Sequence, residues 1–357
     1  MRRLFPLILL TLLLFLFSLF LIREFFPPQK RVKEKFTYQG DLGRVFNILV
    51  IANDAQMITK KMADGRVVKV LEEKSRSDII DIVHVNLDKG IVNMLNIPRD
   101  MLVHIPGYTK AESDTDFCNL DKINHSYFFG KEKLLKEVLL KNYQITIHRY
   151  LTINLYSFSQ VFSLLFPYLK DISLRQKTIR NVEEARKLLR SRRLWARDDV
   201  DRGRNSIIFM KEVWENIWPL AKRKDFQEEI TKNVMRVIGK DTDLTNEDII
   251  YILENLSEKG FDPKNIQLAT LIGYQAPVYL NRYQEVLACY LPIYSEIKNQ
   301  IAYFIFEEEK PAKSYLSDEA FSLPPYVLRN YCPQESNLNS IKRDLTPEHL
   351  NAQTQEF

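Results

Sequence analysis

Three short segments of this sequence carry arginines and aspartates in patterns that suit phosphate binding. They are Arg76-Ser77-Asp78, Ile97-Pro98-Arg99-Asp100 and Leu189-Arg190-Ser191-Arg192. Planar guanidinium groups bind phosphate oxygens with paired hydrogen bonds, and carboxylates are oxygen ligands that a hard cation such as Mg²⁺ prefers. Together the segments predict a site for a phosphate-rich ligand and a divalent cation.

The first two of these segments flank a predicted β-hairpin. Residues 79–86 and 91–97 are rich in β-branched and other apolar residues, and a short polar turn ending at Gly90 separates them. Such a pattern is typical of two antiparallel strands. Because a hairpin brings its outer ends together, we expect the segment at Arg76 to lie beside the segment at Arg99.

Other elements are predicted to complete the frame of an α/β fold. Residues 45–52 form an apolar run that ends at Asn53-Asp54, which predicts a buried strand with polar groups at its end. Asn181 is expected to cap a helix that starts with acidic residues and ends with basic ones, as the helix dipole favours. Further helices are predicted at 131–140, 156–165, 204–222 and 246–259, and further strands at 150–155 and 267–272. Alternating strands and helices indicate a layered α/β domain.

The N-terminus predicts a membrane anchor. Residues 4–22 carry no charge and follow Arg2-Arg3; as a helix they would extend roughly 28 Å, about one bilayer core. No small-residue cleavage site follows, so we expect an uncleaved signal anchor. Residues 1–25 would then comprise a cytoplasmic tip and the transmembrane helix, and 26–43 a linker. The positive-inside rule predicts a single-pass protein of the plasma or inner membrane, with its N-terminus in the cytoplasm and its main domain outside.

Composition excludes several classes of function. The 51 Lys and Arg residues nearly balance 46 Asp and Glu, without a long basic run, so no nucleic-acid partner is expected. Cys118, Cys289 and Cys332 are far apart, which gives no zinc or redox motif and indicates isolated thiols, with one disulfide left open. The sequence contains no Ser-His-Asp pattern, phosphate-binding glycine loop or dinucleotide motif.

In their order along the chain, these motifs resemble those of the LytR-CpsA-Psr family, membrane-anchored transferases of cell-envelope glycopolymers. The resemblance covers roughly residues 45–273. It rests on the following segments: Asn47-Ile48-Leu49-Val50-Ile51 leading to Asp54, Arg76-Ser77-Asp78, Ile97-Pro98-Arg99-Asp100 with Ile105-Pro106-Gly107, Lys122-Ile123-Asn124, Leu189-Arg190-Ser191-Arg192, Asp199-Val200-Asp201-Arg202, and Asp241-Thr242-Asp243-Leu244.

The resemblance implies a fold and an activity. The fold is a three-layer α/β/α sandwich with a central mixed sheet and a lipid-lined groove, expected here over residues 44–300, with 301–357 as a C-terminal extension of unassigned role. The activity is phosphotransfer of a glycopolymer from a polyprenyl-pyrophosphate carrier to an envelope acceptor such as peptidoglycan, with Mg²⁺ or Mn²⁺ as cofactor. An alternative is a non-catalytic member that binds lipid-linked glycan or organises an envelope complex.

The resemblance also implies roles for individual residues. Asp54 and Asp78 match the metal-binding aspartates, and Arg99 and Asp78 are the expected catalytic residues. The phosphate-binding positions are matched by Arg76, Arg99, Lys122, Arg190, Arg192 and Arg202. No base for the acceptor hydroxyl is identified.

The sequence departs from the family pattern at two places. Gln56 stands where an arginine usually follows the first metal aspartate, and Arg202 is followed by Gly203-Arg204-Asn205-Ser206 where the family has Arg-x-x-Arg-Gln. Arg204 is expected to substitute one residue early. The apolar segments 158–166 and 207–218 have two open interpretations, as walls of a lipid groove or as ordinary core helices.

Overall fold

The computed structural model describes residues 38–55, 57–61, 66–71, 75–106, 120–170, 172–174, 176–190, 198–280, 283 and 285–308. The chain divides after Gln39, and every element below lies in the unit that begins at Gly40. The predicted anchor at residues 4–22 and most of the predicted linker fall outside the described residues. None of the helices described here is both long enough and apolar enough to cross a bilayer.

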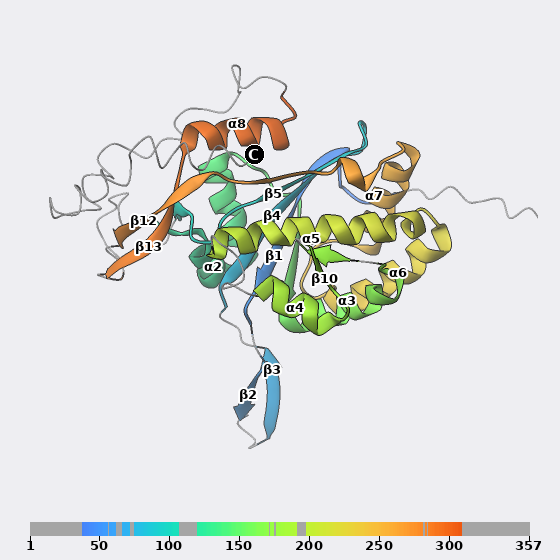
Figure 1. Cartoon of the computed structure of the whole chain (residues 1–357), viewed down its shortest axis with the longest axis horizontal. Coiled ribbons are helices and arrows are strands. Elements are labelled where there is room, and N and C mark those ends of the chain that lie inside the picture. Colours follow the sequence, from blue (N-terminus) through green and yellow to red (C-terminus); the bar gives the residue numbers. More distant parts are fainter. Residues whose placement is uncertain are drawn as a thin grey trace, which may run out of the picture. The chain divides into compact units, whose positions relative to one another are not determined.

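A mixed five-stranded sheet forms the centre of this unit (Figure 1). Its strands, in spatial order, are β11 (Gln267–Thr270), β5 (Ile91–Asn96), β4 (Ser77–Asn86), β1 (Val45–Asn53) and β8 (Arg149–Asn154). The two outer pairs, β11 with β5 and β1 with β8, are parallel, whereas β5–β4 and β4–β1 are antiparallel. The predicted hairpin is confirmed as β4 and β5, and the predicted strand 45–52 is β1.

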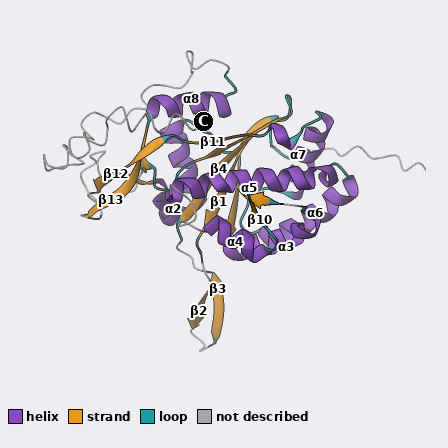
Figure 2. Cartoon of the chain, in the orientation of Figure 1, coloured by secondary structure: helices purple, strands orange, loops and turns teal. Residues whose placement is uncertain are grey.

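Helices flank the sheet on both faces (Figure 2). Helices α2 (Ile123–Tyr143) and α8 (Tyr294–Phe304) share one hydrophobic cluster with Ile80 and Ile82 of β4. Asp81 lies between these isoleucines and, because successive side chains of a strand alternate, points to the opposite face. There it meets helix α5 (Asp198–Ala221).

The remaining helices pack around α5 and β8. They are α3 (Leu155–Leu165), α4 (Val182–Arg190), α6 (Lys224–Ile238) and α7 (Asn246–Glu258). Asn154 and Thr245 each cap a helix through a reciprocal capping box, and Asn181 accepts a hydrogen bond from the amide of Glu184. The predicted cap at Asn181 is thereby confirmed. Helix α5 begins earlier than predicted, and α6 was not predicted.

Four small two-stranded sheets complete the described structure. They are β2 (Met57–Lys61) with β3 (Val67–Leu71), β6 (Leu102–His104) with β7 (Leu120–Lys122), β9 (Ser173–Leu174) with β10 (Lys177–Thr178), and β12 (Gly273–Leu280) with β13 (Glu285–Pro292). Short 3₁₀ turns lie at Phe166–Tyr168 and Pro263–Asn265. Helix α8 crosses the domain boundary expected at residue 300, and its Ile301 is fully buried.

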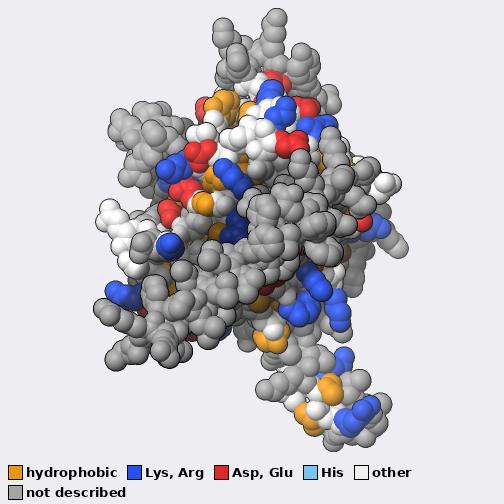
Figure 3. Space-filling view, turned by 90° about the vertical axis from the view of Figure 1, so that its right-hand side faces the viewer, with side chains coloured by type: hydrophobic (Ala, Val, Ile, Leu, Met, Phe, Trp, Pro, Cys, Tyr) orange, Lys and Arg blue, Asp and Glu red, His pale blue; other side chains and the backbone are white. Residues whose placement is uncertain are grey.

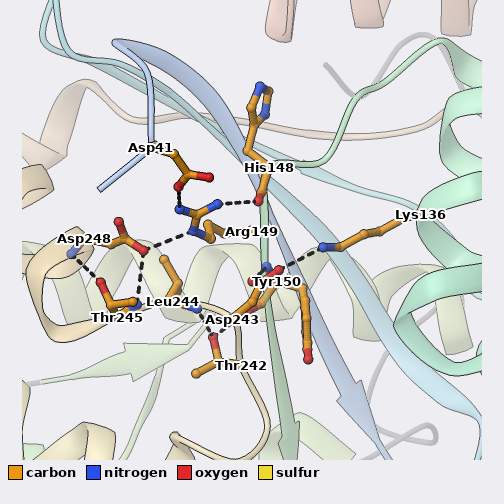
Figure 4. A network of polar contacts seen from close by, with 10 residues as sticks. All are labelled: Asp41, Lys136, His148, Arg149, Tyr150, Thr242, Asp243, Leu244, Thr245 and Asp248. Carbon is orange, nitrogen blue, oxygen red and sulfur yellow. Dashed lines mark hydrogen bonds and ion pairs between the residues drawn. The ribbon is translucent and has the colours of Figure 1, made fainter. Parts of the chain in front are cut away.

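A polar network fastens the segment before α7 to strand β8 (Figure 4). Arg149 of β8 forms ion pairs with Asp41 and with the buried Asp248, the latter at 3.0 Å. Asp243 accepts a hydrogen bond from the backbone of β8 and lies 3.0 Å from the Nζ of Lys136 in α2. The family-like segment 241–244 therefore has a structural role at the edge strand.

Candidate functional site

Asp78 is the centre of a charged cluster formed by three separate parts of the chain. It lies in β4, and its carboxylate accepts a hydrogen bond from Arg99, which follows β5. Arg202, near the start of α5, places Nη2 3.3 Å from the same carboxylate. The Arg202 side chain is only 5% exposed, against 14% for Arg99 and 23% for Asp78. Closure of the β4–β5 hairpin thus brings Arg99 to Asp78, as the sequence predicted.

The cluster continues as a row of alternating charges. Asp100 lies 3.7 Å from the Nε of Arg99 and 3.2 Å from the Nζ of Lys122, which precedes helix α2. The row therefore reads Arg202, Asp78, Arg99, Asp100, Lys122, with three positive and two negative side chains. The excess of one positive charge favours an anionic ligand beside it.

Asp54 and Arg76 are tied together at the ends of β1 and β4. The Arg76 amide donates to Oδ1 of Asp54 over 3.2 Å, and the Asp54 amide donates to the Arg76 carbonyl over 3.4 Å. Both side chains are exposed. The antiparallel pairing of β1 with β4 thus places the first predicted metal ligand at the same sheet end as Asp78.

One cavity of about 110 Å³ joins several of these side chains. Asp54, Asp78 and Arg202 line it, together with Arg186 of α4 and the apolar residues Ala52, Ile79, Ile153, Leu155, Phe158 and Leu189. Arg186 was not among the residues singled out from the sequence, although it lies four positions before Arg190 and so on the same helix face. The side chain of Arg190 and all of Arg192 fall outside the described residues, so their phosphate-binding role stays a prediction.

The carboxylates that line this cavity fit a cation that is also bound by a substrate phosphate. Among the described residues, no group of three or more His, Cys, Asp or Glu side chains gathers for metal binding. Two carboxylates, Asp54 and Asp78, line the cavity. Mg²⁺ characteristically uses one or two carboxylates and completes its shell with water and substrate phosphate oxygens. This pair would therefore suit Mg²⁺ or Mn²⁺ when a phosphate is present.

A larger apolar cavity adjoins the charged one. It has a volume of about 320 Å³ and shares Ile153 and Phe158 with the charged cavity. Helices α3, α5 and α6 supply most of its wall, including Val161, Phe162, Leu165, Phe209, Val213, Trp214, Ile217, Ile230 and Val234. Segments 158–166 and 207–218 therefore line a cavity, and two of their buried rings, Phe162 and Phe209, also belong to a hydrophobic core cluster.

The structure does not support the expected substitution by Arg204. Arg204 lines a different cavity of about 290 Å³, with Val200, Thr270, Leu271 and Tyr290, and does not line the cavity of Asp78. A helix turns about 100° per residue, so Arg202 and Arg204 project in different directions. Asn205 is fully buried, and neither atom of its amide has a hydrogen-bond partner among the described residues.

Beneath α5 lies a second carboxylate that the sequence did not single out. Asp81 is fully buried and accepts hydrogen bonds from Ser206 over 2.6 Å and from Asn96 over 2.6 Å. Burial raises the pKa of Asp81 to about 7, although these two donors partly offset the effect. The only sequence signal was an acidic residue within the apolar strand 79–86.

Comparison with known proteins gives a family match and several partial relatives. Residues 27–178 match the model of the LytR_cpsA_psr family. A teichoic acid transferase TagU of Oceanobacillus iheyensis is 32% identical over 91 residues, which are 24% of this chain and 25% of that protein. The TagU of Halalkalibacterium halodurans is 34% identical over 90 residues, 25% and 27% of the two chains. The matched segment thus spans about a quarter of the length of these relatives.

Solved structures share the fold at low sequence identity. The crystal structure of Bacillus subtilis TagV has a TM-score of 0.53 at 18% identity and covers 74% of this chain and 98% of its own. A Streptococcus agalactiae protein gives 0.58 at 15%, with 80% and 95% covered. TagT bound to LI-WTA gives 0.52 at 17%, with 78% and 96% covered. These similarities show the mixed sheet with its flanking helices.

Proposed function

This chain belongs to the LytR-CpsA-Psr family, whose model its residues 27–178 match, and from this we propose that it transfers a glycopolymer from a polyprenyl-pyrophosphate carrier to peptidoglycan or another envelope acceptor. Two relatives named as polyisoprenyl-teichoic acid–peptidoglycan teichoic acid transferases support that class of donor and acceptor. The proposal includes the anchor at residues 4–22 and an extracytoplasmic main domain.

The observation that carries the proposal is the junction of a charged cavity with an apolar one. The charged cavity contains Asp54, Asp78 and Arg202, and the apolar cavity begins at the shared residues Ile153 and Phe158. A ligand that fills both must have an anionic head and a long apolar tail. A polyprenyl pyrophosphate has this chemistry, whereas a free nucleotide or an acidic peptide would leave the apolar cavity unused.

The proposed reaction is an in-line displacement at phosphorus. The oxygen of the acceptor hydroxyl forms a bond to the phosphorus that carries the glycan and its proton passes to water. The bond from that phosphorus to the bridging oxygen breaks, and polyprenyl phosphate leaves. Arg99 and Arg202 would hold the phosphate oxygens, and Lys122 would support them from the end of the charge row. Asp54 and Asp78 would hold Mg²⁺, which would supply Lewis-acid stabilisation of the leaving phosphate. Such transition states depend mainly on positioning and electrostatics.

The test is transfer of glycan from a synthetic polyprenyl-pyrophosphate donor by the full-length chain, measured as release of polyprenyl phosphate. Arg99→Ala should lower kcat/KM by about 10² to 10³, since it removes a positioned cation at the reacting phosphate. Asp78→Ala should abolish transfer. Arg204→Ala is the matched control, because Arg204 lines a separate cavity, and should leave transfer unchanged. Full activity of Arg99→Ala would overturn the assignment.

A second candidate is a protein of the same fold that binds lipid-linked glycan without turnover. Asn205 favours it, because this buried amide stands where the family pattern has an arginine. The same assay separates the two functions. Saturable binding of the donor without release of polyprenyl phosphate, across several acceptors, would support the binding protein.

A further inference from the structure

The chain leaves the sheet between two residues of the charged site. Asp54 and Arg76 are hydrogen-bonded to each other, and the chain between them forms the hairpin of β2 and β3. Among the described strands β2 pairs only with β3, and the hairpin projects away from the five-stranded sheet (Figures 1 and 3). The base of this hairpin therefore lies at the rim of the proposed donor site.

This hairpin, residues 57–71, exposes aliphatic side chains. Ile58 is 44% exposed and Val67 is 64% exposed. Isolated two-stranded hairpins are only marginally stable in water, and unpaired strand edges are usually protected. An exposed hairpin with β-branched side chains is better explained if a partner covers it.

The hairpin is also basic. Lys60, Lys61, Arg66 and Lys69 stand against one acidic residue, Asp64, which gives a formal charge of +3 over residues 57–71. Lys60 and Arg66 are exposed, like Ile58 and Val67. Figure 3 shows basic and apolar groups together on the projecting hairpin. A surface of this kind suits an anionic bilayer, where aliphatic groups enter the interface and Lys or Arg side chains contact lipid phosphates.

We propose that the β2–β3 hairpin docks on an anionic membrane surface. A soluble polyanion would pair with Lys60 and Arg66 but would leave Ile58 and Val67 in water, so the aliphatic residues favour lipid. Strands of five residues extend about 16 Å, so docking would hold the charged cavity within about that distance of the bilayer. The purpose of docking rests on the proposed function, because that function needs a membrane-resident donor. The docking itself is independent of the proposed function.

The experiment uses the full-length chain in lipid nanodiscs, without donor or acceptor. An environment-sensitive fluorophore is attached at Ile58→Cys in a Cys118→Ser/Cys332→Ser background. Cys289 can stay, because it is buried and burial raises its thiol pKa to about 12. The matched control is Val286→Cys, an exposed aliphatic position of the other large hairpin, β12–β13.

In discs of equal parts phosphatidylcholine and phosphatidylglycerol, the label at residue 58 should shift to the blue and be quenched by brominated acyl chains. The label at residue 286 should show neither change. Lys60→Gln should lower the docking equilibrium constant roughly fivefold, as expected for one basic residue near an anionic surface. Equal signals at 58 and 286, or a shift produced only by soluble polyphosphate in neutral discs, would overturn the proposal.

Donor turnover then separates this inference from the proposed function. Ile58→Ser/Val67→Ser should raise KM for a bilayer-embedded donor and leave KM for a detergent-dispersed donor unchanged. If no variant and no wild-type chain transfers glycan, but the label at residue 58 still docks, the proposed function fails and the membrane contact stands.

Discussion

Strand β4 carries two carboxylates, three residues apart, that the fold places in opposite electrostatic surroundings. Asp78 lies between the guanidinium groups of Arg99 and Arg202 and lines the charged cavity. Asp81 is fully buried, and its hydrogen-bond donors, Ser206 and Asn96, are both neutral. Burial raises the pKa of Asp81, and no charged partner offsets that effect, so the surroundings and not the residue type separate the two aspartates.

Helix α5 contributes to both surroundings. It supplies Arg202 to Asp78 and, one turn later, Ser206 to Asp81. The Ser206 hydroxyl lies 2.6 Å from Asp81 and 2.5 Å from the carbonyl of Gly203. A hydroxyl has one proton, so an ionised Asp81 and the Gly203 carbonyl must share it, whereas a protonated Asp81 can donate to Ser206 while Ser206 donates to Gly203. Below the pKa of Asp81 the buried cluster is thus a neutral clamp that positions the charged end of the helix.

The largest expected effect comes from Asp81→Asn, which fixes the neutral form. In unfolded chains an aspartate loses its proton near its ordinary pKa of 3.8, whereas folded Asp81 keeps it up to about 7. Between these values the folded state binds more protons, so its stability falls as pH rises, by about 1.4 kcal/mol per unit. We expect Asp81→Asn to match the wild type near pH 4 and to be more stable by about 4 kcal/mol at pH 8.

Denaturant unfolding of the full-length chain in mild detergent, followed by tryptophan fluorescence, measures this difference across the pH range. The amide nitrogen of the asparagine would donate to Ser206, and its oxygen would accept from Asn96, so the geometry is retained. Asp88→Asn, at an exposed turn carboxylate, is the control and should run parallel to the wild type. If the stability of Asp81→Asn also changes with pH in parallel with that of the wild type, the neutral clamp is contradicted.

A somewhat smaller effect, in the opposite direction, should follow from Gly203→Ala, which lowers stability because it disturbs the surroundings of both carboxylates. A Cβ atom at Gly203 would lie 2.4 Å from Oδ1 of Asn96, so α5 would have to move away from the sheet. Overpacking of this kind costs about 1–3 kcal/mol, more than the gain of about 1 kcal/mol from alanine in a helix. Unfolding experiments should show the loss, whereas Gly43→Ala, whose Cβ would meet nothing closer than 4.0 Å, should show none.

Local pattern predicted much of the frame and of the charged cluster. The β4–β5 hairpin depends on neighbouring residues, and its closure alone brings Arg99 to Asp78, so the pair could be inferred before the fold was known. Capping by Asn181 is likewise local, since its partner is the amide of Glu184. The ordered set of motifs then placed Arg202 and Lys122 at the same site.

Features that depend on distant partners were not predictable. Asp81 meets Ser206 across 125 positions, so nothing near Asp81 distinguishes a neutral clamp from a surface charge. The β2–β3 hairpin was missed because its lysines interrupt the apolar pattern of the strands. The cavity that Arg204 lines was not predictable either, because spacing along a sequence does not give the side of a helix that faces a cavity.

The smallest effect expected is a change in coupling, produced by Asp78→Asn. Without ligands, Asp78 pairs with both Arg99 and Arg202, so a phosphate must compete with a carboxylate for the same guanidinium groups. A cation that binds Asp78 would release them, and a phosphate that takes the guanidinium groups would release Asp78. Each ligand should therefore tighten binding of the other, by the same factor in both directions.

For the wild type we expect Mg²⁺ to strengthen pyrophosphate binding about tenfold, near the lower end of such coupling energies. In Asp78→Asn, pyrophosphate alone should bind at least as tightly as to the wild type, and Mg²⁺ should add little. Calorimetric titration with pyrophosphate, corrected for formation of the magnesium complex in solution, measures both quantities without any turnover. Weaker binding of pyrophosphate to Asp78→Asn in the absence of Mg²⁺ would mean that Asp78 orients the arginines instead of competing for them, and the contrast with Asp81 would then be one of burial alone.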